Sequence, residues 1–478
     1  MHPTLGSASP SKSLLDTLRS LLGADAVSTD EETLERLSFD AIDPHRLMAK
    51  SASVESRVAV AVRPETTAQV AAVVRLAAGS DVPVIPYGGG TGVMGAVIPL
   101  AGGVALDLRR MNRVLEVRRE ERLAVVQPGV YLADFDAVAR AHGLIMGHDP
   151  WSVPIATVGG AISTDSVGYR ASKYGSMGQQ VAGLEVVLGD GRIVRTRPLA
   201  RQSSGPMLNG LFAGAEGTMG VITEATIRLF AEPEERTFAT VGFASFEAGY
   251  PVLTRLFGLG LVPALIDLTE EEPGEDAENF PCLLYLGFEG YREEVAAQRT
   301  RALIEATSGG GVDIGPGATQ RYWQTRHAIA ERWRDRTRPL RPTERWRERR
   351  WRSADYLHVS LPVGKVLEYK RFAEQVTARH ALAIREAAVW TDPRLFSLFV
   401  VDPDDAHVEL DRPPLWAAVD EMLDAAIAMG GGVEYCHGLG TKLGSWATRE
   451  WGDALILARG LKHAVDPQGI LNPSKLGL

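Results

Sequence analysis

Three consecutive glycines after a short apolar stretch constrain this chain more than any other feature of its sequence. Residues 82–86 have the composition of a buried strand, and the segment PYGGGTG at residues 86–92 begins where that stretch ends. Glycine has no Cβ, so the N–H groups of successive glycines can converge on an anion. The segment predicts a phosphate-binding loop that requires neither a lysine nor a metal ion. A plain hairpin turn is the alternative for this loop taken alone.

A Rossmann dinucleotide site must also be considered, because residues 90–95 (GTGVMG) satisfy the pattern G-x-G-x-x-G. That fold requires a helix to begin at the loop, since the pyrophosphate binds at the helix N-terminus. Here Pro99 and the pair Gly102-Gly103 interrupt the next turns, and a strand-like stretch follows at 104–108. The sequence therefore argues against a Rossmann fold.

Three later segments also combine glycine with small residues. They are GHDPWSVPIATVGG at 147–160, TDSVG at 164–168 and EGTMGVI at 216–222. Prolines stiffen the first of them. Each segment alone is a weak signal, but in this order they predict several loops that wrap one extended cofactor.

The chain has 478 residues, which is too long for one compact core, so two or three domains are expected. Short strands and helices alternate as far as residue 233, as in an α+β or mixed α/β domain. Strands are expected beyond it near 238–245, 282–288 and 356–361, and helices near 292–306, 365–378 and 413–429. The predicted organisation is an N-terminal helical segment at 1–54, a cofactor domain at 55–233, a second domain at 234–430, and a C-terminal segment at 431–478 that returns to the cofactor site.

Composition excludes several classes of protein. The net charge of −9 argues against nucleic acid as a partner. Two cysteines fit a reducing compartment and leave no spacing for a zinc or iron–sulfur site. No signal peptide is evident, and no apolar run approaches the roughly 18 residues that a membrane-spanning helix needs. We expect a cytoplasmic protein.

Residues 321–352 depart from this acidic composition. They contain twelve arginines and four tryptophans against four acidic residues. One interpretation is a solvated, partly helical surface. The other is a patch that binds anions, a partner or the surface of a membrane, because arginine pairs with carboxylate and phosphate and tryptophan favours interfaces.

The glycine-rich loops, with VQPG at 126–129 and DPQGILNPSK at 466–475, resemble the FAD-binding domain of the vanillyl-alcohol oxidase flavoproteins. The likeness lies in the branch of D-2-hydroxy-acid dehydrogenases and alkylglycerone-phosphate synthases. It covers residues 55–233 well and extends more weakly to the C-terminus. It implies an α+β fold in which a PCMH-type FAD-binding domain of two subdomains carries a cap domain with an antiparallel sheet and helices, of the FAD-linked oxidase C-terminal type.

The resemblance also implies which residues hold FAD. Some relatives attach the flavin through a histidine after the first glycines, but Thr91 stands there, so FAD is expected to be dissociable. Carried over by position, the cofactor-binding residues are Pro86, Tyr87, Gly88, Gly89, Gly90, Thr91, Gly92, Trp151, Ser152, Val153, Pro154, Ile155, Ala156, Thr157, Gly159, Gly160, Thr164, Asp165, Ser166, Val167, Glu216, Gly217, Thr218, Met219, Gly220, Val221, Ile222 and Asn472.

Three arginines are similar to functional arginines of the family. Arg201, in RQSSGP, matches a catalytic arginine of the synthases, and near the flavin it would stabilise negative charge on the reduced ring. Arg334 falls where those enzymes bind substrate. Arg326, in WQTR, is similar to the W-x-x-R that grips a carboxylate in hydroxy-acid dehydrogenases. The alternative for Arg326 and Arg334 is solvent-exposed charge.

The departures from the family matter as much. Phe396 aligns with the acid–base tyrosine of the synthases, and VVDPDDAH at 400–407 lacks the histidines of the metal-dependent dehydrogenases, so no metal is expected. His437 is the candidate proton acceptor because its ordinary pKa is near neutrality, unless it is structural. Tyr435 is a second base or a residue of the pocket wall. Asn472 and Lys475 close the site or merely pack the chain end.

The preferred interpretation is an FAD-dependent dehydrogenase or oxidase that takes a hydride from a 2-hydroxy acid or related alcohol. The substrate is then a small anionic organic molecule, and the electron acceptor is unidentified. A synthase-like transferase is the first alternative. A flavoprotein subunit that docks on a partner or a membrane surface through residues 321–352 is the second, and a homodimer is compatible with each.

Overall fold

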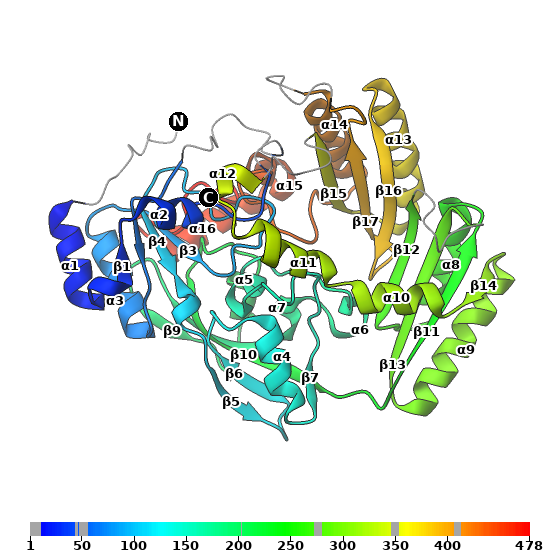
Figure 1. Ribbon diagram of the computed structural model, residues 1–478, viewed down its shortest axis with the longest axis horizontal. Coiled ribbons are helices and arrows are strands. Elements are labelled where there is room, and N and C mark those ends of the chain that lie inside the picture. The colour runs from blue at the N-terminus through cyan, green and yellow to red at the C-terminus, as the bar shows by residue number, and fades with distance from the viewer. Residues whose placement is uncertain are drawn as a thin grey trace.

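The computed structural model describes residues 11–43, 46, 56–201, 203–271, 280–345, 353–405 and 413–478. The predicted N-terminal segment, Gln202, the end of the arginine-rich stretch and the end of VVDPDDAH fall partly or wholly outside these ranges. Figure 1 shows two halves that lie side by side. We call the elements from α1 to β10, with α16, the cofactor half, and the elements from β11 to α14 the cap.

The first sheet of the cofactor half has four strands in the order β1-β2-β4-β3, of which the last three run parallel. Helix α3 connects β2 to β3 and begins where the Thr66 hydroxyl accepts the N–H of Gln69 at 3.2 Å. Its buried residues fall at helical spacing and pack on the sheet. The elements of this part are α1 (Lys12–Leu22), η1 (Ala24–Ala26), β1 (Val27–Ser28), α2 (Glu31–Leu37), β2 (Val60–Val62), α3 (Thr67–Ala78), β3 (Val84–Tyr87), β4 (Val104–Asp107) and η3 (Leu108–Arg110).

No helix follows the glycine loop, because the chain passes from β3 through residues 88–103 directly to β4. A Rossmann site is therefore absent, as the prolines and glycines of this stretch predicted. The C-terminal segment instead extends this sheet. Leu471 forms a parallel bridge with Val84, whose N–H donates to the carbonyl of Ile470 and whose carbonyl accepts the N–H of Asn472.

The second sheet of the cofactor half is antiparallel, in the order β5-β6-β10-β8-β9, with β7 also paired to β10. Its apolar face packs with α4, α5 and α7 in one core. The elements are β5 (Val114–Arg118), β6 (Leu123–Val126), α4 (Leu132–Arg140), β7 (Leu144–Met146), α5 (Val158–Ser163), α6 (Ala171–Tyr174), α7 (Met177–Gln180), β8 (Val181–Val187), β9 (Ile193–Arg195), η4 (Leu208–Leu211), β10 (Val221–Ala231) and α16 (Ala454–Val465).

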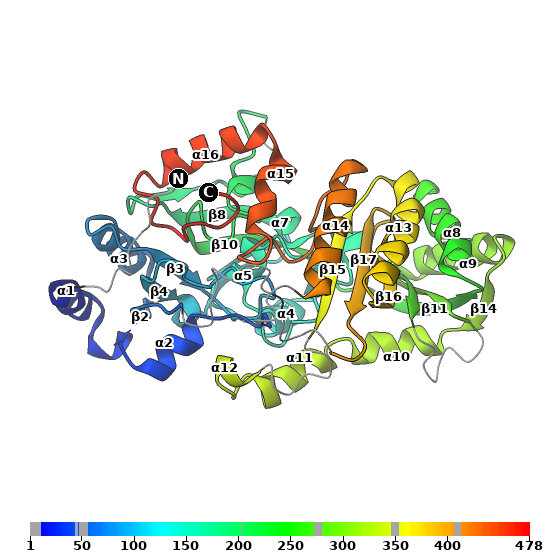
Figure 2. The same ribbon diagram turned by 90° about the horizontal axis from the view of Figure 1, so that it is seen from above.

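The cap is built on one antiparallel sheet of seven strands in the order β14-β11-β13-β12-β16-β17-β15. Helices α8, α9, α13 and α14 cover one face of it (Figure 2). The elements are β11 (Glu235–Phe243), α8 (Phe246–Gly258), β12 (Leu265–Glu271), β13 (Cys282–Gly290), α9 (Arg292–Ser308), β14 (Val312–Gly315), β15 (Ala354–Ser360), η7 (Val363–Lys365), α13 (Val366–Arg379), β16 (Ala383–Trp390), β17 (Leu395–Val401) and α14 (Pro414–Ala428), followed by η8 (Gly444–Trp446) and α15 (Ala447–Trp451).

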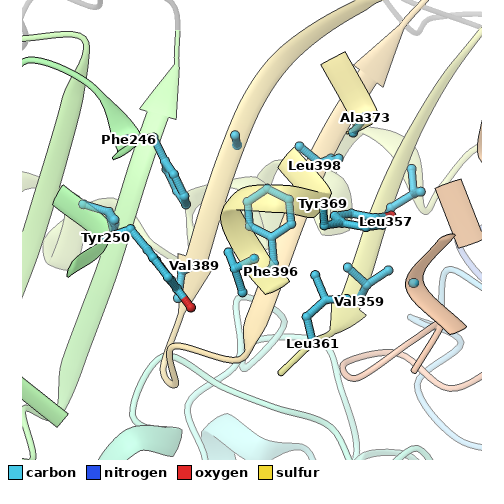
Figure 3. Close-up of a cluster of buried hydrophobic side chains, with 14 of the residues drawn as sticks. Phe246, Tyr250, Leu357, Val359, Leu361, Tyr369, Ala373, Val389, Phe396 and Leu398 are labelled. Carbon is cyan, nitrogen blue, oxygen red and sulfur yellow. The ribbon is translucent and has the colours of Figure 1, made fainter. Parts of the chain in front are cut away.

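Alternation along the cap strands separates two faces of different chemistry, because successive side chains point to opposite sides of a sheet. The helix-covered face is apolar, and Figure 3 shows Leu357, Val389, Phe396 and Leu398 together on it. The opposite face, which we call the inner face, carries polar and aromatic side chains: Asp267, Tyr285, Tyr356, His358, Glu386, Trp390, Ser397 and Phe399.

The inner face is turned toward the cofactor half. The Tyr174 hydroxyl donates to the Glu289 carboxylate at 2.8 Å, and the rings of Tyr169 and Tyr322 meet edge to face at 5.7 Å. Tyr322 in turn donates to Asp267 at 2.8 Å. Polar residues on this face are therefore buried between the two halves of the molecule.

The described part of the arginine-rich stretch, as far as residue 345, forms a strap that leaves the cap and reaches α2 (Figure 2). It consists of α10 (Gly317–Thr325), α11 (Ala328–Arg332), the π-helical turn η5 (Trp333–Thr337) and α12 (Pro342–Arg345). Arg36 donates to the carbonyls of Arg338 and Pro339 at 3.2 and 2.9 Å, which fastens the strap to α2. Among the described residues, no helix is both long and apolar enough to span a membrane.

Candidate active site

The predicted loops surround one cavity, which we call the cofactor cavity. It contains about 1250 Å³ of space outside the protein atoms, part of it open to solvent. The predicted residues that line it are Pro86, Tyr87, Gly88, Gly89, Gly90, Thr91, Gly92, Trp151, Ser152, Ala156, Thr157, Gly159, Gly160, Thr164, Ser166, Val167, Glu216, Gly217, Gly220, Ile222, Asn472 and His437.

Seven predicted cofactor residues lie outside the wall of this cavity. Thr218, Met219 and Val221 are buried behind it, and the Thr218 hydroxyl donates to the carbonyl of Ala215. The Asp165 carboxylate accepts the N–H of Gly178 at 2.7 Å and points away. The other three are Val153, Pro154 and Ile155, which form the turn before α5. Within each motif, some residues line the cavity and others are buried behind it. The position of a residue in a family motif does not say which of the two it does.

The glycine loop lies in van der Waals contact with the segment that precedes α5. A Cβ on Gly88 would collide with Oγ1 of Thr157, and one on Gly89 would stand 2.5 Å from the carbonyl oxygen of Ile155. Gly90 has φ +65°, a conformation that L side chains rarely adopt. Glycine is required here by contact and conformation together, and the two loops form one continuous wall.

The polar groups of this wall suit a phosphate-bearing cofactor. Thr157 is 1% exposed, and its Oγ1 has no hydrogen-bond partner among the described residues. Buried hydroxyls are nearly always paired, so a ligand is expected to bond it. His437 is the one lysine, arginine or histidine among the described residues that line the cavity. A cofactor would therefore be held through N–H groups and hydroxyls rather than through basic side chains.

A buried carboxylate joins the cofactor half to the turn after the cap. Both oxygens of Glu216 accept the N–H of Gly440, at 3.1 and 3.0 Å, and Oε1 also accepts that of Leu439 at 2.6 Å. Burial raises the pKa of Glu216 to about 7, against the effect of these hydrogen bonds. Sequence comparison assigned Glu216 to cofactor binding, and its side chain fixes the turn that carries His437.

Asn472 and Lys475 attach the C-terminal segment to the same wall. The Asn472 amide donates to the carbonyls of Ala96 and Glu216 at 3.0 and 2.7 Å, and Lys475 Nζ donates to Ile98 at 2.8 Å. Burial lowers the pKa of Lys475 to about 8. Asp40, which lines the cavity, accepts the N–H of Gly95 at 2.9 Å, and burial raises its pKa to about 6.

The turn after the cap positions His437 beside an acid. Glu434 Oε1 accepts the N–H groups of Cys436 and His437 at 2.7 and 3.0 Å and lies 3.6 Å from Nδ1 of His437. Burial alone would lower the pKa of His437, but Cys436 and Glu434 raise it to about 10. His437 is therefore a cation at neutral pH, which suits binding of an anion better than the proton abstraction that the sequence suggested.

A second histidine, which the sequence did not single out, lies next to His437. The ring of His358 on β15 is 4.6 Å from that of His437, centroid to centroid, and is 3% exposed. Burial lowers the pKa of His358 well below its ordinary value, and the charge of His437 lowers it further. The two rings therefore share one proton at neutral pH, and it resides on His437.

Hydrogen bonds extend from His358 to Tyr435. Nδ1 of His358 lies 2.7 Å from Oγ of Ser397 on β17, and that oxygen lies 2.8 Å from the Tyr435 hydroxyl. Burial raises the pKa of Tyr435 well above its usual value, so the phenol is neutral. These two hydrogen bonds connect His358, Ser397 and Tyr435, which are far apart in sequence.

Tyr435 also lines a second cavity, which we call the outer cavity. It contains about 1050 Å³ of space outside the protein atoms, part of it open to solvent, between the cofactor half and the cap. Its walls include Asp165, Ser172, Thr391 and Asp392. His437 and Cys436 line the cofactor cavity, whereas their neighbour Tyr435 lines the outer one, so this turn separates the two spaces.

Arg326 is not free to bind a substrate in this structure. Its Nε donates to Asp149 Oδ2 at 3.0 Å, and its guanidinium lies 3.9 Å from the ring centroid of Trp323. Asp149 is buried and is also bonded by His327 at 2.9 Å, and Arg170, Arg326 and His327 overcome the effect of burial to hold the pKa of that carboxyl well below its usual range. Arg326 joins the cap to the cofactor half.

Arg334 and Arg201 lie at the surface and outside the wall of either cavity. Arg334 is paired with its neighbour Asp335 at 2.8 Å, and both side chains are exposed. Arg201 is exposed on the loop that leads from β9 to η4. Exposed arginines leave no signal in the pattern of charges, so likeness to the synthases alone suggested these two positions.

Phe396 does not stand in the active site, contrary to the alignment. Figure 3 shows it on the helix-covered face of the cap, and its ring meets Phe246 and Tyr369 edge to face. Its neighbour Ser397 points to the inner face because of the alternation of the strand. Phenylalanine at position 396 therefore has no bearing on proton transfer at this site.

The fold and the site together define a flavoprotein with a cofactor half and a covering cap. Two family models match the chain, FAD binding domain over residues 58–197 and FAD linked oxidases, C-terminal domain, over residues 232–476. The chain therefore belongs to the FAD-linked oxidases. FAD is its cofactor, and the predicted family and α+β fold are confirmed.

Curated relatives span most of the chain at low identity. Glycolate oxidase subunit GlcD of Bacillus subtilis is 27% identical over 87% of this chain and 88% of its own length. A D-lactate dehydrogenase of Anaerostipes hadrus is 27% identical over 88% and 90%. An alkyldihydroxyacetonephosphate synthase of Dictyostelium discoideum is 26% identical over 87% and 72%.

Solved structures share the fold at still lower identity. A structure of alkyldihydroxyacetonephosphate synthase has a TM-score of 0.77 at 22% identity and covers 98% of this chain and 86% of its own. p-Cresol methylhydroxylase with bound substrate has a TM-score of 0.77 at 19% identity, over 98% and 96%. These likenesses bear on the architecture alone.

Proposed function

We propose that this FAD-linked oxidoreductase oxidises a small 2-hydroxy acid to the corresponding 2-oxo acid. The observation that carries the proposal is His437, the one basic side chain among the described residues that line the cofactor cavity. Its raised pKa makes it a cation under ordinary conditions. A cation in the wall of the cavity favours a small anion, and relatives named glycolate oxidase subunit and D-lactate dehydrogenase support a hydroxy acid.

The residues around the cavity have separate tasks in this proposal. FAD, when bound, supplies the acceptor for the hydride that leaves the carbon bearing the hydroxyl group. Gly88 to Gly90 and Thr157 hold the cofactor, and protonated His437 holds the substrate carboxylate. The cap limits the access of water to this part of the cavity, which strengthens the contact between the His437 cation and the substrate carboxylate.

A direct test is an anaerobic screen of D-lactate, L-lactate, glycolate and 2-hydroxyglutarate against the purified yellow protein. Oxidation of any of them bleaches the visible flavin band, and the 2-oxo acid accumulates in equal amount. A protein whose flavin band is unchanged by every 2-hydroxy acid in the screen contradicts the proposal.

The Dictyostelium relative supports a second candidate, a redox-neutral alkyl transferase. The position of Phe396 in the apolar core removes the argument that this chain lacks an acid–base group, because Tyr435 still borders the site. The same screen separates the two functions. A transferase gives no net bleaching with a hydroxy acid and instead exchanges the substituent of a glycerone ester.

We also infer that FAD is bound without a covalent bond. Thr91 lines the cofactor cavity at the position where some relatives carry the histidine that links the flavin. A hydroxyl is a poor partner for that link. Acid precipitation should release the yellow colour into the supernatant, and colour that stays with the pellet would contradict this expectation.

A further inference from the structure

The turn at residues 435–437 lies between the cofactor cavity and the outer cavity. His437 lines the first cavity and Tyr435 the second. Ser397 and His358 are 0% and 3% exposed and lie between them on the inner face of the cap. Buried hydroxyls and imidazoles are costly unless they are bonded, so the hydrogen-bonded row from His358 to Tyr435 calls for an explanation.

We propose that His358, Ser397 and Tyr435 form a proton relay that carries the hydroxyl proton of the substrate from the cofactor cavity to the outer cavity. His358 is the group that accepts the proton, and Ser397 and Tyr435 pass it on. The proposal rests on the proposed function for the origin of the proton, and on the two hydrogen bonds of 2.7 and 2.8 Å for its route.

The step balances as one proton in and one proton out. The substrate O–H bond breaks and its proton bonds to Nε2 of His358, while the C–H hydrogen leaves with its electron pair as hydride to FAD. The proton on Nδ1 of His358 moves to Oγ of Ser397, whose own proton moves to the Tyr435 oxygen. The Tyr435 proton then passes to water in the outer cavity, and each relay residue remains neutral.

Among the described residues, His437 lines the cofactor cavity and the His358 ring lies 4.6 Å behind it, so the substrate proton has to reach His358 past the edge of His437. Nε2 of His358 has no hydrogen bond within the described part of the chain, whereas Nδ1 is bonded to Ser397. Either oxygen of the pair Ser397 and Tyr435 can donate. A hydroxyl that both donates and accepts is what a relay requires.

The charge of His437 explains why the proton must move on. Two protonated imidazoles with ring centroids 4.6 Å apart repel each other, so His358 cannot retain a proton beside a protonated His437. A substrate carboxylate bound to His437 weakens that repulsion and makes His358 a better acceptor. Substrate binding would thus prepare the base.

Other charged groups surround the relay, and one of them titrates near neutrality, because burial raises the pKa of Asp267 to about 7. Asp355 accepts hydrogen bonds from Lys442 at 2.7 Å and Arg46 at 2.8 Å, a cluster with net positive charge that also keeps His358 neutral. The residues that face His358 or Tyr435 are His437, Cys436 and Glu434 on the turn, Tyr356 on β15, Trp390 on β16, Asp267 on β12, and Arg46 and Lys442.

Proton exchange at His358 tests the relay without any substrate. In the FAD-loaded protein labelled with ¹⁵N-histidine, the ring N–H signal of His358 is assigned by its loss in His358→Gln, and its exchange with water is measured by NMR. Tyr435→Phe and Ser397→Ala should each slow this exchange at least about tenfold. Tyr356→Phe is the matched control, since its hydroxyl donates to Glu386 at 2.9 Å and is not part of the relay.

Unchanged exchange in Tyr435→Phe overturns the relay, and so does an equal slowing in Tyr356→Phe. A second measurement follows flavin reduction by D-lactate in H₂O and D₂O. Tyr435→Phe should reduce the rate about 10- to 100-fold and change the solvent isotope effect, with the KM unchanged. A wild-type flavin that no hydroxy acid reduces would refute the proposed function, whereas the exchange measurement would still decide the relay.

Discussion

The two walls of the cofactor cavity are built on different principles. The wall of the cofactor half uses glycines and one unpaired hydroxyl, and it contains no lysine or arginine among its described residues. The wall near the cap contains a charged imidazole, and a neutral histidine and two hydroxyls lie behind it. The first wall recognises a large ligand through backbone shape, and the second acts on a small ligand through side-chain protons. Substitutions in the first wall should abolish FAD binding. Substitutions in the second wall should leave a folded protein with bound FAD and alter only its kinetics with substrate.

The largest effect is expected from Gly89→Val. A side chain there would meet the carbonyl of Ile155, so the loop would move and the cofactor wall would open. We expect a colourless protein whose far-ultraviolet circular dichroism is unchanged. Gly460→Ala on α16 is the matched control, because a Cβ there meets nothing within 4 Å. A Gly89→Val protein that retains stoichiometric FAD would contradict the contrast between the walls.

A smaller effect is expected from His437→Gln, which removes a charge but retains bulk. The protein should remain yellow, and kcat/KM for D-lactate should fall about 10- to 150-fold, mainly through KM, because a hydrogen bond to a charged group contributes about 1.5–3 kcal/mol. Stopped-flow flavin reduction over a range of substrate concentrations separates the two constants. His380→Gln, a histidine paired with Glu421 at the surface, is the control. A lower limiting rate at unchanged KM would return His437 to the role of base.

The pH dependence sharpens the same distinction. The pKa of His437 is raised to about 10, so its cation is present below that pH and is lost above it. Substrate affinity should be constant from pH 7 to 9 and should weaken by up to tenfold per unit above about 10. Measuring the KM across this pH range shows whether substrate binding weakens as His437 loses its proton. A reduction rate that instead rises steadily toward pH 10 would mean that His437 must lose its proton to work.

The smallest kinetic effects are expected from the arginines that the sequence suggested as substrate ligands. Arg326→Met should lower the midpoint of thermal unfolding, because Asp149 loses one of its partners, at a cost of about 1–3 kcal/mol. Arg334→Met should change neither stability nor kinetics, since the residue is exposed. The KM for D-lactate should be unchanged in both variants. A raised KM in Arg326→Met would show that substrate displaces Asp149.

The sequence predicted the wall of the cofactor half because glycine is required wherever the backbone must approach another group closely. PYGGGTG, ATVGG and EGTMGVI all contribute to one cavity, and the family likeness identified FAD. The same signal does not distinguish wall from core, so Thr218 and Val221 were assigned to the ligand although they pack behind it. Strands of the cap near 238–245, 282–288 and 356–361 were also predicted, since buried strands have strong apolar runs.

The inner face of the cap could not be predicted in the same way. His358 and Ser397 come from strands whose pairing is set by long-range contacts, and neither has a motif around it. Phe396 was aligned with an acid–base tyrosine, but it lies on the helix-covered face, and one residue along a strand is the difference between the two faces. Six of the seven residues at 395–401 are apolar, so no alternation in the sequence marks which of them face the site.

The attachment of the C-terminal segment has a consequence for biosynthesis. Leu471 lies beside a strand that ends nearly four hundred residues earlier, and Asn472 and Lys475 hold the loop that follows that strand. While the ribosome still retains these residues, the wall of the cavity lacks its last members. FAD is therefore expected to be retained only after translation has passed this segment.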